Sequence, residues 1–133
     1  MGYLIDSGIF IAIERGALAP EAFVGQAGDE SCFVSVVTES ELWHGVHRAS
    51  TAERAAKRAA FVEKCLREAP SLPADHLVAR KHALIWAQLE ASGLVIGAHD
   101  LWIAATALVH DLKLATRNER EFRRVPGLKV EVW

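Results

Sequence analysis

Long apolar runs and paired cysteines are missing from this 133-residue sequence. The longest apolar stretch, Leu101–Val109, is interrupted by Thr106 and is far shorter than the roughly 18 residues of a membrane span. The two cysteines, Cys32 and Cys65, stand far apart, and the first residues lack the basic start and apolar stretch of a signal peptide. We therefore expect a cytoplasmic protein with reduced thiols and no association with a membrane.

A large excess of charge of either sign is missing too. Fifteen Lys and Arg residues against seventeen Asp and Glu residues give a net charge of −2, which neither requires nor excludes a nucleic acid as partner. Apolar residues make up 51% of the chain and charged residues 24%, as in ordinary globular proteins. We expect one domain over residues 1–133, with a self-supporting core.

The short motifs of several enzyme classes are absent. The chain has no GxGxxG or GxxxxGK[ST] for nucleotide phosphates, no HExxH or CxxC for metals, and no GxSxG for a hydrolase nucleophile. His44 and His47 stand three residues apart on a predicted helix and could contact one metal ion. Because no third ligand stands nearby in the sequence, a surface position is the favoured interpretation for both.

Predicted strands and helices alternate along the whole chain. Compact apolar runs predict the strands, at Tyr3–Ile5, Cys32–Val37, Leu112–Ala115 and Leu128–Val132, with a short one around Ser71–Leu72. Amphipathic or apolar stretches predict the helices, at Ser7–Arg15, Pro20–Gln26, Thr38–Ala49, Thr51–Glu68, Ala74–Ser92 and Asp100–His110. This alternation predicts an α/β fold, with helices on both faces of a parallel sheet.

Four carboxylates, Asp6, Glu41, Asp100 and Glu121, stand at the starts of predicted helices. Each has an ordinary explanation as a helix cap, since Thr38-Glu39-Ser40-Glu41 matches a capping box and Asn118-Glu119-Arg120-Glu121 resembles one. Their joint placement favours function, because ligands of open parallel sheets bind beyond the carboxyl ends of the strands. We therefore expect the four carboxylates to converge at that edge.

Carboxylates gathered in this way repel one another unless a cation lies among them. Mg²⁺ or Mn²⁺ takes oxygen ligands, activates water and neutralises charge on a phosphodiester, so the cluster indicates a metal-dependent phosphodiesterase. Thr116 and Asn118 could support a carboxylate or water, or serve only the turn. Basic residues suited to phosphates crowd beside Glu121: Arg117, Arg120, Arg123 and Arg124. A second basic group, Arg54, Lys57 and Arg58, fits a solvated helix face equally well.

Four segments resemble, in order and spacing, those of PIN-domain ribonucleases, most of all the VapC-type toxins of bacterial and archaeal toxin–antitoxin modules. They are YLIDSGIF, VSVVTESELWHGV, IGAHDLWIAATAL and LATRNEREFRRVPGLKVEVW. The resemblance spans Tyr3 to Trp133 and implies a three-layer α/β/α fold with a parallel sheet of about five strands. It also implies a Mg²⁺- or Mn²⁺-dependent endoribonuclease that cuts RNA, often tRNA or rRNA, and so inhibits translation.

The resemblance further implies roles and partners. The family's acidic positions fall on Asp6, Glu41, Asp100 and Glu121, of which the first three would bind metal. Its hydroxyl positions match Ser7 and Thr116, and its asparagine matches Asn118. Members of the family are typically homodimers, and a cognate VapB-type antitoxin covers the site. Operator DNA is contacted through the antitoxin.

Two positions depart from the family pattern. Gly8 stands where an asparagine often follows the hydroxyl residue, and Glu121 stands where aspartate is common. These departures leave an alternative open, a non-catalytic PIN-like module that binds an antitoxin and acts in operon regulation. A metal-dependent phosphatase for small molecules is less favoured, because no nucleotide- or sugar-binding loop is visible.

Overall fold

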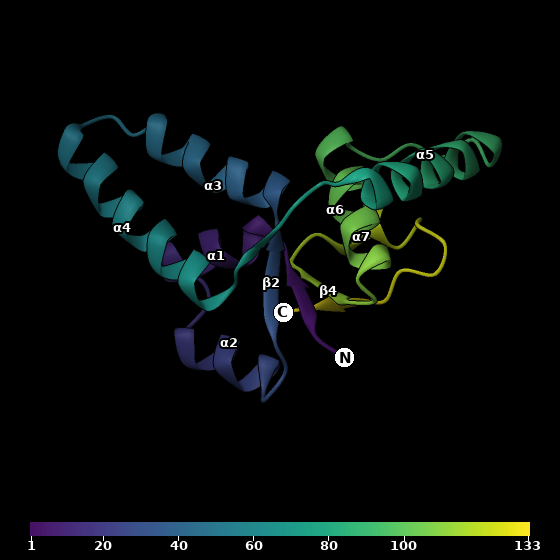
Figure 1. Ribbon diagram of the computed structural model, residues 1–133. Coiled ribbons are helices and arrows are strands. Elements are labelled where there is room, and N and C mark those ends of the chain that lie inside the picture. The colour runs from purple at the N-terminus through teal and green to yellow at the C-terminus, as the bar shows by residue number, and fades with distance from the viewer.

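A five-stranded parallel sheet with helices on both faces forms the fold in the computed structural model, which describes residues 1–133 (Figure 1). The strands are β1 (Tyr3–Ile5), β2 (Cys32–Ser35), β3 (Ser71–Leu72), β4 (Lys113–Thr116) and β5 (Val130–Val132). Their order in the sheet is β3-β2-β1-β4-β5, and every neighbouring pair is parallel. The predicted three-layer α/β/α fold is confirmed.

Seven helices connect and cover the strands. They are α1 (Ser7–Glu14), α2 (Pro20–Ala27), α3 (Val36–His47), α4 (Ala52–Glu68), α5 (His76–Ala91), α6 (Ala98–Val109) and α7 (Glu119–Phe122). In Figure 1 helices α1 to α4 lie on one side of the strands and α5 to α7 on the other. No helix combines the length and apolar character that crossing a bilayer requires.

The side chains of β1 point alternately into two separate hydrophobic cores, one on each face of the sheet. Leu4 belongs to the core under α5 and α6, whereas Tyr3 and Ile5 belong to the core under α1 to α4. This arrangement follows from the period of two along a strand, which sends successive side chains to opposite faces. β1 is buried on both faces and is the central strand of the sheet. Asp6, which directly follows it, therefore lies in the middle of the sheet edge.

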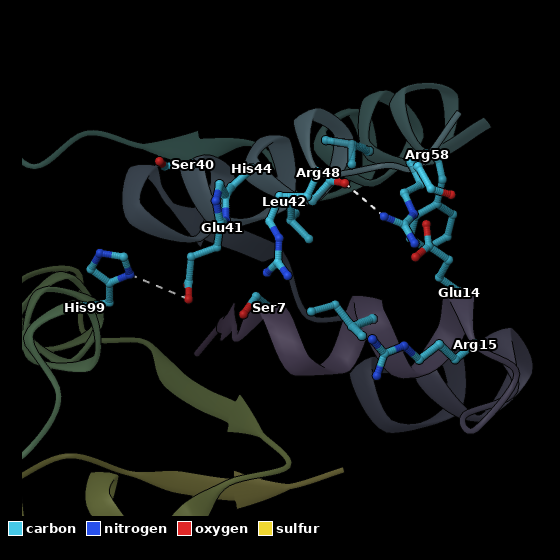
Figure 2. A pocket seen from close by; sticks show the side chains of 15 residues that line it. Ser7, Glu14, Arg15, Ser40, Glu41, Leu42, His44, Arg48, Arg58 and His99 are labelled. Atoms are coloured by element: carbon cyan, nitrogen blue, oxygen red, sulfur yellow. Dashed lines mark hydrogen bonds and ion pairs between the residues drawn. The ribbon is translucent and has the colours of Figure 1, made fainter. Parts of the chain in front are cut away.

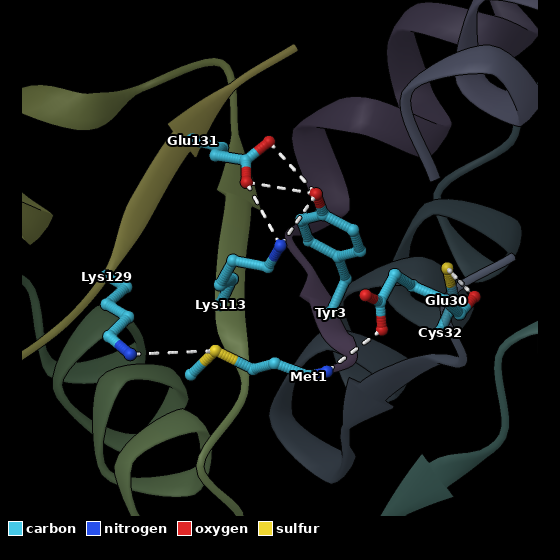
Figure 3. A network of polar contacts seen from close by, with 7 residues as sticks. All are labelled: Met1, Tyr3, Glu30, Cys32, Lys113, Lys129 and Glu131. Carbon is cyan, nitrogen blue, oxygen red and sulfur yellow. Dashed lines mark hydrogen bonds and ion pairs between the residues drawn. The ribbon is translucent and has the colours of Figure 1, made fainter. Parts of the chain in front are cut away.

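A polar network ties β1 to β4 and β5 at the start of the strands (Figure 3). The Tyr3 hydroxyl donates to the Glu131 carboxylate at 2.9 Å and accepts a hydrogen bond from Lys113 Nζ at 3.1 Å. Lys113 Nζ also lies 3.5 Å from Glu131. These three side chains project from the same face of neighbouring strands and fix their register.

The boundary between β2 and α3 differs from the prediction. The strand ends at Ser35 rather than Val37, because the Ser35 hydroxyl accepts a hydrogen bond from the Thr38 backbone N–H at 3.0 Å and caps the helix. The predicted capping box at Thr38 to Glu41 is therefore wrong. Glu41 lies inside α3, beyond its first turn, and its carboxylate does not cap the helix.

Candidate active site

The four predicted carboxylates converge where the strands end. Asp6 follows β1, Glu41 comes from α3, Asp100 from the first turn of α6, and Glu121 from α7. Burial raises the pKa of Glu41, and the negative charge of Asp6 raises it further. The Asp100 pKa also responds to the charges of Asp6, Glu121 and Glu41. The four carboxylates therefore lie close enough together for their charges to shift one another's pKa values, as the sequence predicts.

Asp6 is the most firmly held of the four. Its side chain caps α1 by accepting from the Ser7 backbone N–H at 3.0 Å, and its other oxygen accepts from the Thr116 hydroxyl at 2.8 Å. Burial raises the Asp6 pKa, and these two hydrogen bonds oppose the rise because they favour the ionised form. Asp6 thus caps α1 and also holds its carboxylate oxygens in a fixed position at the site.

Glu41 has one oxygen engaged and one free. Its Oε2 lies 3.7 Å from Nδ1 of His99, which stands at the start of α6 (Figure 2). Its Oε1 is buried and has no hydrogen-bond partner. A buried acceptor without a partner is costly, so Oε1 is suited to a ligand such as a cation.

Asp100 and Glu121 meet beside Gly97. Glu121 Oε2 accepts from the Gly97 backbone N–H at 3.1 Å. A Cβ atom at Gly97 would lie 3.6 Å from both Asp100 Oδ2 and Glu121 Oε2. Burial, followed by a hydrogen bond with Glu121, raises the Asp100 pKa to about 7. The Gly97 N–H and the bond from Asp100 lower the Glu121 pKa, so Asp100 is the more readily protonated of the two carboxyls.

The donor set fits a hard cation by its chemistry, although no group of three acidic, histidine or cysteine side chains is arranged to hold a metal ion in this structure. All four side chains are carboxylates, one buried oxygen lacks a partner, and the Asp100 pKa is raised to about 7. A divalent ion would favour the ionised form of Asp100 and supply positive charge among the carboxylates. Hard oxygen donors of this kind suit Mg²⁺ or Mn²⁺.

The predicted supporting residues stand beside Asp6 and Glu41. Ser7 is buried and lines the same cleft as Glu41, with its hydroxyl on the side of that carboxylate (Figure 2). Thr116 holds Asp6, and the Thr116 Oγ1 itself accepts from the Asn118 backbone N–H at 3.0 Å. The Asn118 side chain makes no capping hydrogen bond to α7. Asn118 therefore supports Thr116 through its backbone.

Three of the four predicted phosphate-binding arginines have partners within the chain. Arg123 pairs with Glu119, Arg124 donates to the Val95 carbonyl, and Arg117 donates to the Trp133 carbonyl at 3.4 Å. Arg120 is exposed. None of the four lines the cleft that opens beside Glu41.

That cleft, of about 770 Å³, brings in His99, Arg15 and Arg48, which the sequence analysis did not single out for the site. Of the second predicted basic group, Arg58 lines the cleft, whereas Arg54 and Lys57 do not. The sequence does contain one signal for Arg48. It caps the C-terminal end of α3 seven residues, or about two helical turns, after Glu41, so both residues lie on the same side of the helix. The meeting of α1, α3, α4 and α6 around one cleft depends on tertiary packing, which the spacing does not encode.

Comparison with known proteins gives consistent matches over nearly the whole chain. The family model described as PIN domain matches residues 3–128. Ribonuclease VapC1 of Rickettsia felis is 35% identical over 132 residues, which cover 98% of this chain and 95% of that protein. The tRNA(fMet)-specific endonuclease VapC of Salmonella typhimurium is 33% identical over 100 residues, 75% of this chain and 74% of that protein.

A solved structure shows the same architecture. The chain superposes on one from the crystal structure of DNA-bound VapBC from Salmonella typhimurium with a TM-score of 0.87 and 27% sequence identity. The superposition covers 100% of this chain and 98% of that chain. The likeness therefore extends over the sheet, both helical layers and the edge that carries the carboxylates.

Proposed function

The chain belongs to the PIN-domain family of VapC ribonucleases, and from this premise we propose how it acts. It is an endoribonuclease, the toxin of a toxin–antitoxin pair, and it cuts RNA phosphodiesters with the help of Mg²⁺ or Mn²⁺. The observation that carries the metal dependence is the gathering of Asp6, Glu41 and Glu121 around Asp100, with Glu41 Oε1 buried and unpartnered. Carboxylates gathered in this way repel one another, and a bound cation removes that repulsion.

Asp6, Asp100 and Glu41 would hold the ion, and Glu121 would support Asp100. When bound, Mg²⁺ or Mn²⁺ lowers the pKa of water and neutralises charge on a phosphodiester. Thr116 and the Ser7 N–H orient Asp6 and favour its ionised form. Glu41, with one oxygen toward His99 and one free, is placed to orient the attacking water and accept its proton.

The non-catalytic alternative is not favoured. At Gly8 an added Cβ would meet no atom within 4 Å, so glycine there leaves space and distorts nothing. Glu121 still reaches the Gly97 N–H and Asp100 despite its longer side chain. Neither departure from the family pattern therefore removes a carboxylate from the site.

The partners follow from the relatives. Salmonella VapC is named for its action on tRNA(fMet), and the matching solved structure is a DNA-bound VapBC complex. We propose RNA as the substrate, a cognate VapB-type antitoxin as the protein partner, and operator DNA reached only through that antitoxin. A homodimer is also proposed, because Leu77, Leu84 and Trp86 expose apolar surface along α5.

Cleavage of end-labelled total tRNA and rRNA by purified, antitoxin-free protein tests this function. Reactions contain Mg²⁺, Mn²⁺ or EDTA, and Asp6→Asn and Asp100→Asn proteins are compared with Asp29→Asn. Asp29 is an exposed carboxylate away from the site, so its variant controls for the loss of one charge. We expect discrete fragments that require the metal and vanish only in the two site variants. Fragments of equal yield in EDTA would contradict the metal dependence.

A further inference from the structure

The cleft beside the carboxylates has a basic half. It lies between α1 on one side and α3 with α4 on the other, and Figure 2 shows the side chains facing each other across it. Ser7, Glu41 and His99 line the end at the carboxylate site. Arg15, Arg48 and Arg58 are among the residues that line the remainder, where Glu14 is the one carboxylate.

The arginines differ in how firmly the protein holds them. Arg58 is half-buried and donates to the Gly45 carbonyl at 3.0 Å, which ties α4 to α3. Arg15 and Arg48 are exposed and take part in none of the four ion pairs of the chain. Two guanidinium groups without a protein partner therefore face a cleft that leads to the carboxylate site.

Helix stability explains only part of this placement. Arg15 and Arg48 are the C-terminal caps of α1 and α3, where positive charge interacts favourably with the helix dipole. That effect accounts for a basic residue at each helix end. It does not account for both ends opening, with Arg58, onto the one cleft that contains Glu41.

We propose that Arg15 and Arg48 bind backbone phosphates of the RNA strand that flanks the bond to be cut. The proposal rests on the proposed nuclease function and identifies how its substrate is held. The planar guanidinium matches phosphate oxygens with paired hydrogen bonds. Ser7 and Arg15 are separated by about 12 Å along α1. Arg15 therefore lies along the cleft from the carboxylate site, where an RNA strand leaving that site would pass.

Binding without turnover tests the proposal apart from cleavage. The probe is a fluorescein-labelled oligouridylate in EDTA, and its anisotropy is followed from about 50 to about 200 mM salt. The proteins compared are wild type, Arg15→Gln, Arg48→Gln and Arg48→Lys, with Arg80→Gln as control. Arg80 is exposed on α5, on the other side of the sheet. Circular dichroism and thermal unfolding confirm that each variant is folded.

We expect Arg15→Gln and Arg48→Gln each to weaken binding about three- to tenfold and to lower the salt slope by about 0.7. Arg48→Lys keeps the charge and should retain the slope, and Arg80→Gln should match wild type. In cleavage assays the two glutamine variants should raise KM more than they lower kcat. Unchanged affinity and slope in both glutamine variants would overturn the proposal.

Other outcomes separate the remaining explanations. If both variants bind RNA normally but lose affinity for the antitoxin, the arginines serve the protein partner and the proposal is wrong. If both only lower the midpoint of thermal unfolding, they serve the helix ends, and it is again wrong. Failure of wild-type protein to cut any RNA would count against the proposed function, whereas the binding data would still decide the role of the arginines.

Discussion

Replacing Asp100 by asparagine should make the metal-free protein more stable at alkaline pH. Burial and the bond with Glu121 raise the Asp100 pKa from 3.8 to about 7, so the folded state favours the protonated carboxyl. The stability that this group contributes is complete below its unfolded pKa and is lost as the pH rises toward about 7. Above that value the ionised carboxylate destabilises the fold, and asparagine removes this charge.

The magnitude follows from the shift. Counted in full, about three pKa units correspond to roughly 4 kcal/mol. Asp100 is only half-buried, so solvent screening reduces the expected gain to about 1–2 kcal/mol at pH 8. For a chain of this size, that gain raises the midpoint of thermal unfolding by roughly 3–8 °C.

Thermal unfolding followed by circular dichroism, in EDTA at pH 5 and pH 8, measures this effect. Wild type is compared with Asp100→Asn and with Asp29→Asn as the charge control. Adding Mn²⁺ at pH 8 should stabilise wild type and leave Asp100→Asn nearly unchanged, because binding to the folded state alone raises stability. The reasoning would be refuted if Asp100→Asn were less stable than wild type at pH 8, or if their difference were the same at both pH values.

Three further predictions concern single groups. Ser35→Ala removes the cap that the Thr38 N–H uses and should lower the free energy of unfolding by about 1 kcal/mol in urea titration, while Ser35→Thr should retain most of it. Thr116→Val removes the hydrogen bond to Asp6 and should weaken Mn²⁺ binding by about tenfold in calorimetry, with Thr116→Ser restoring it; equal affinity in all three proteins would contradict that role. Burial raises the Cys65 pKa to about 12, so iodoacetamide at pH 8 should modify Cys65 only after unfolding, and rapid labelling of the native protein would contradict this.

Most of the sheet could be predicted from the sequence because β1, β2 and β4 are compact apolar runs followed by a helix signal. The β2–α3 boundary could not, because Val36 and Val37 continue the apolar pattern of the strand. What decides the boundary is the Ser35 hydroxyl, which satisfies the Thr38 N–H and starts the helix two residues early. Thr38 also suits a cap by residue type, so only the folded backbone distinguishes the two positions.

The convergence of the carboxylates could be predicted, since the strands are parallel and their carboxyl ends therefore meet at one edge of the sheet. Their individual partners could not. His99 reaches Glu41 because α6 begins opposite α3, and Glu121 reaches the Gly97 N–H across a gap of 24 residues in the sequence. The basic half of the cleft likewise depends on how α1 meets α3 and α4, which no local pattern specifies.

The most direct test of the metal site is anomalous scattering from Mn²⁺ in crystals grown with that ion at pH 8. We predict an anomalous peak bonded to carboxylate oxygens of Asp6 and Asp100, with Glu41 bound directly or through water. Crystals of Asp100→Asn grown in the same way should lack the peak. A wild-type crystal saturated with Mn²⁺ that shows no density among these carboxylates, or shows it only elsewhere on the chain, would contradict the proposed metal-dependent site.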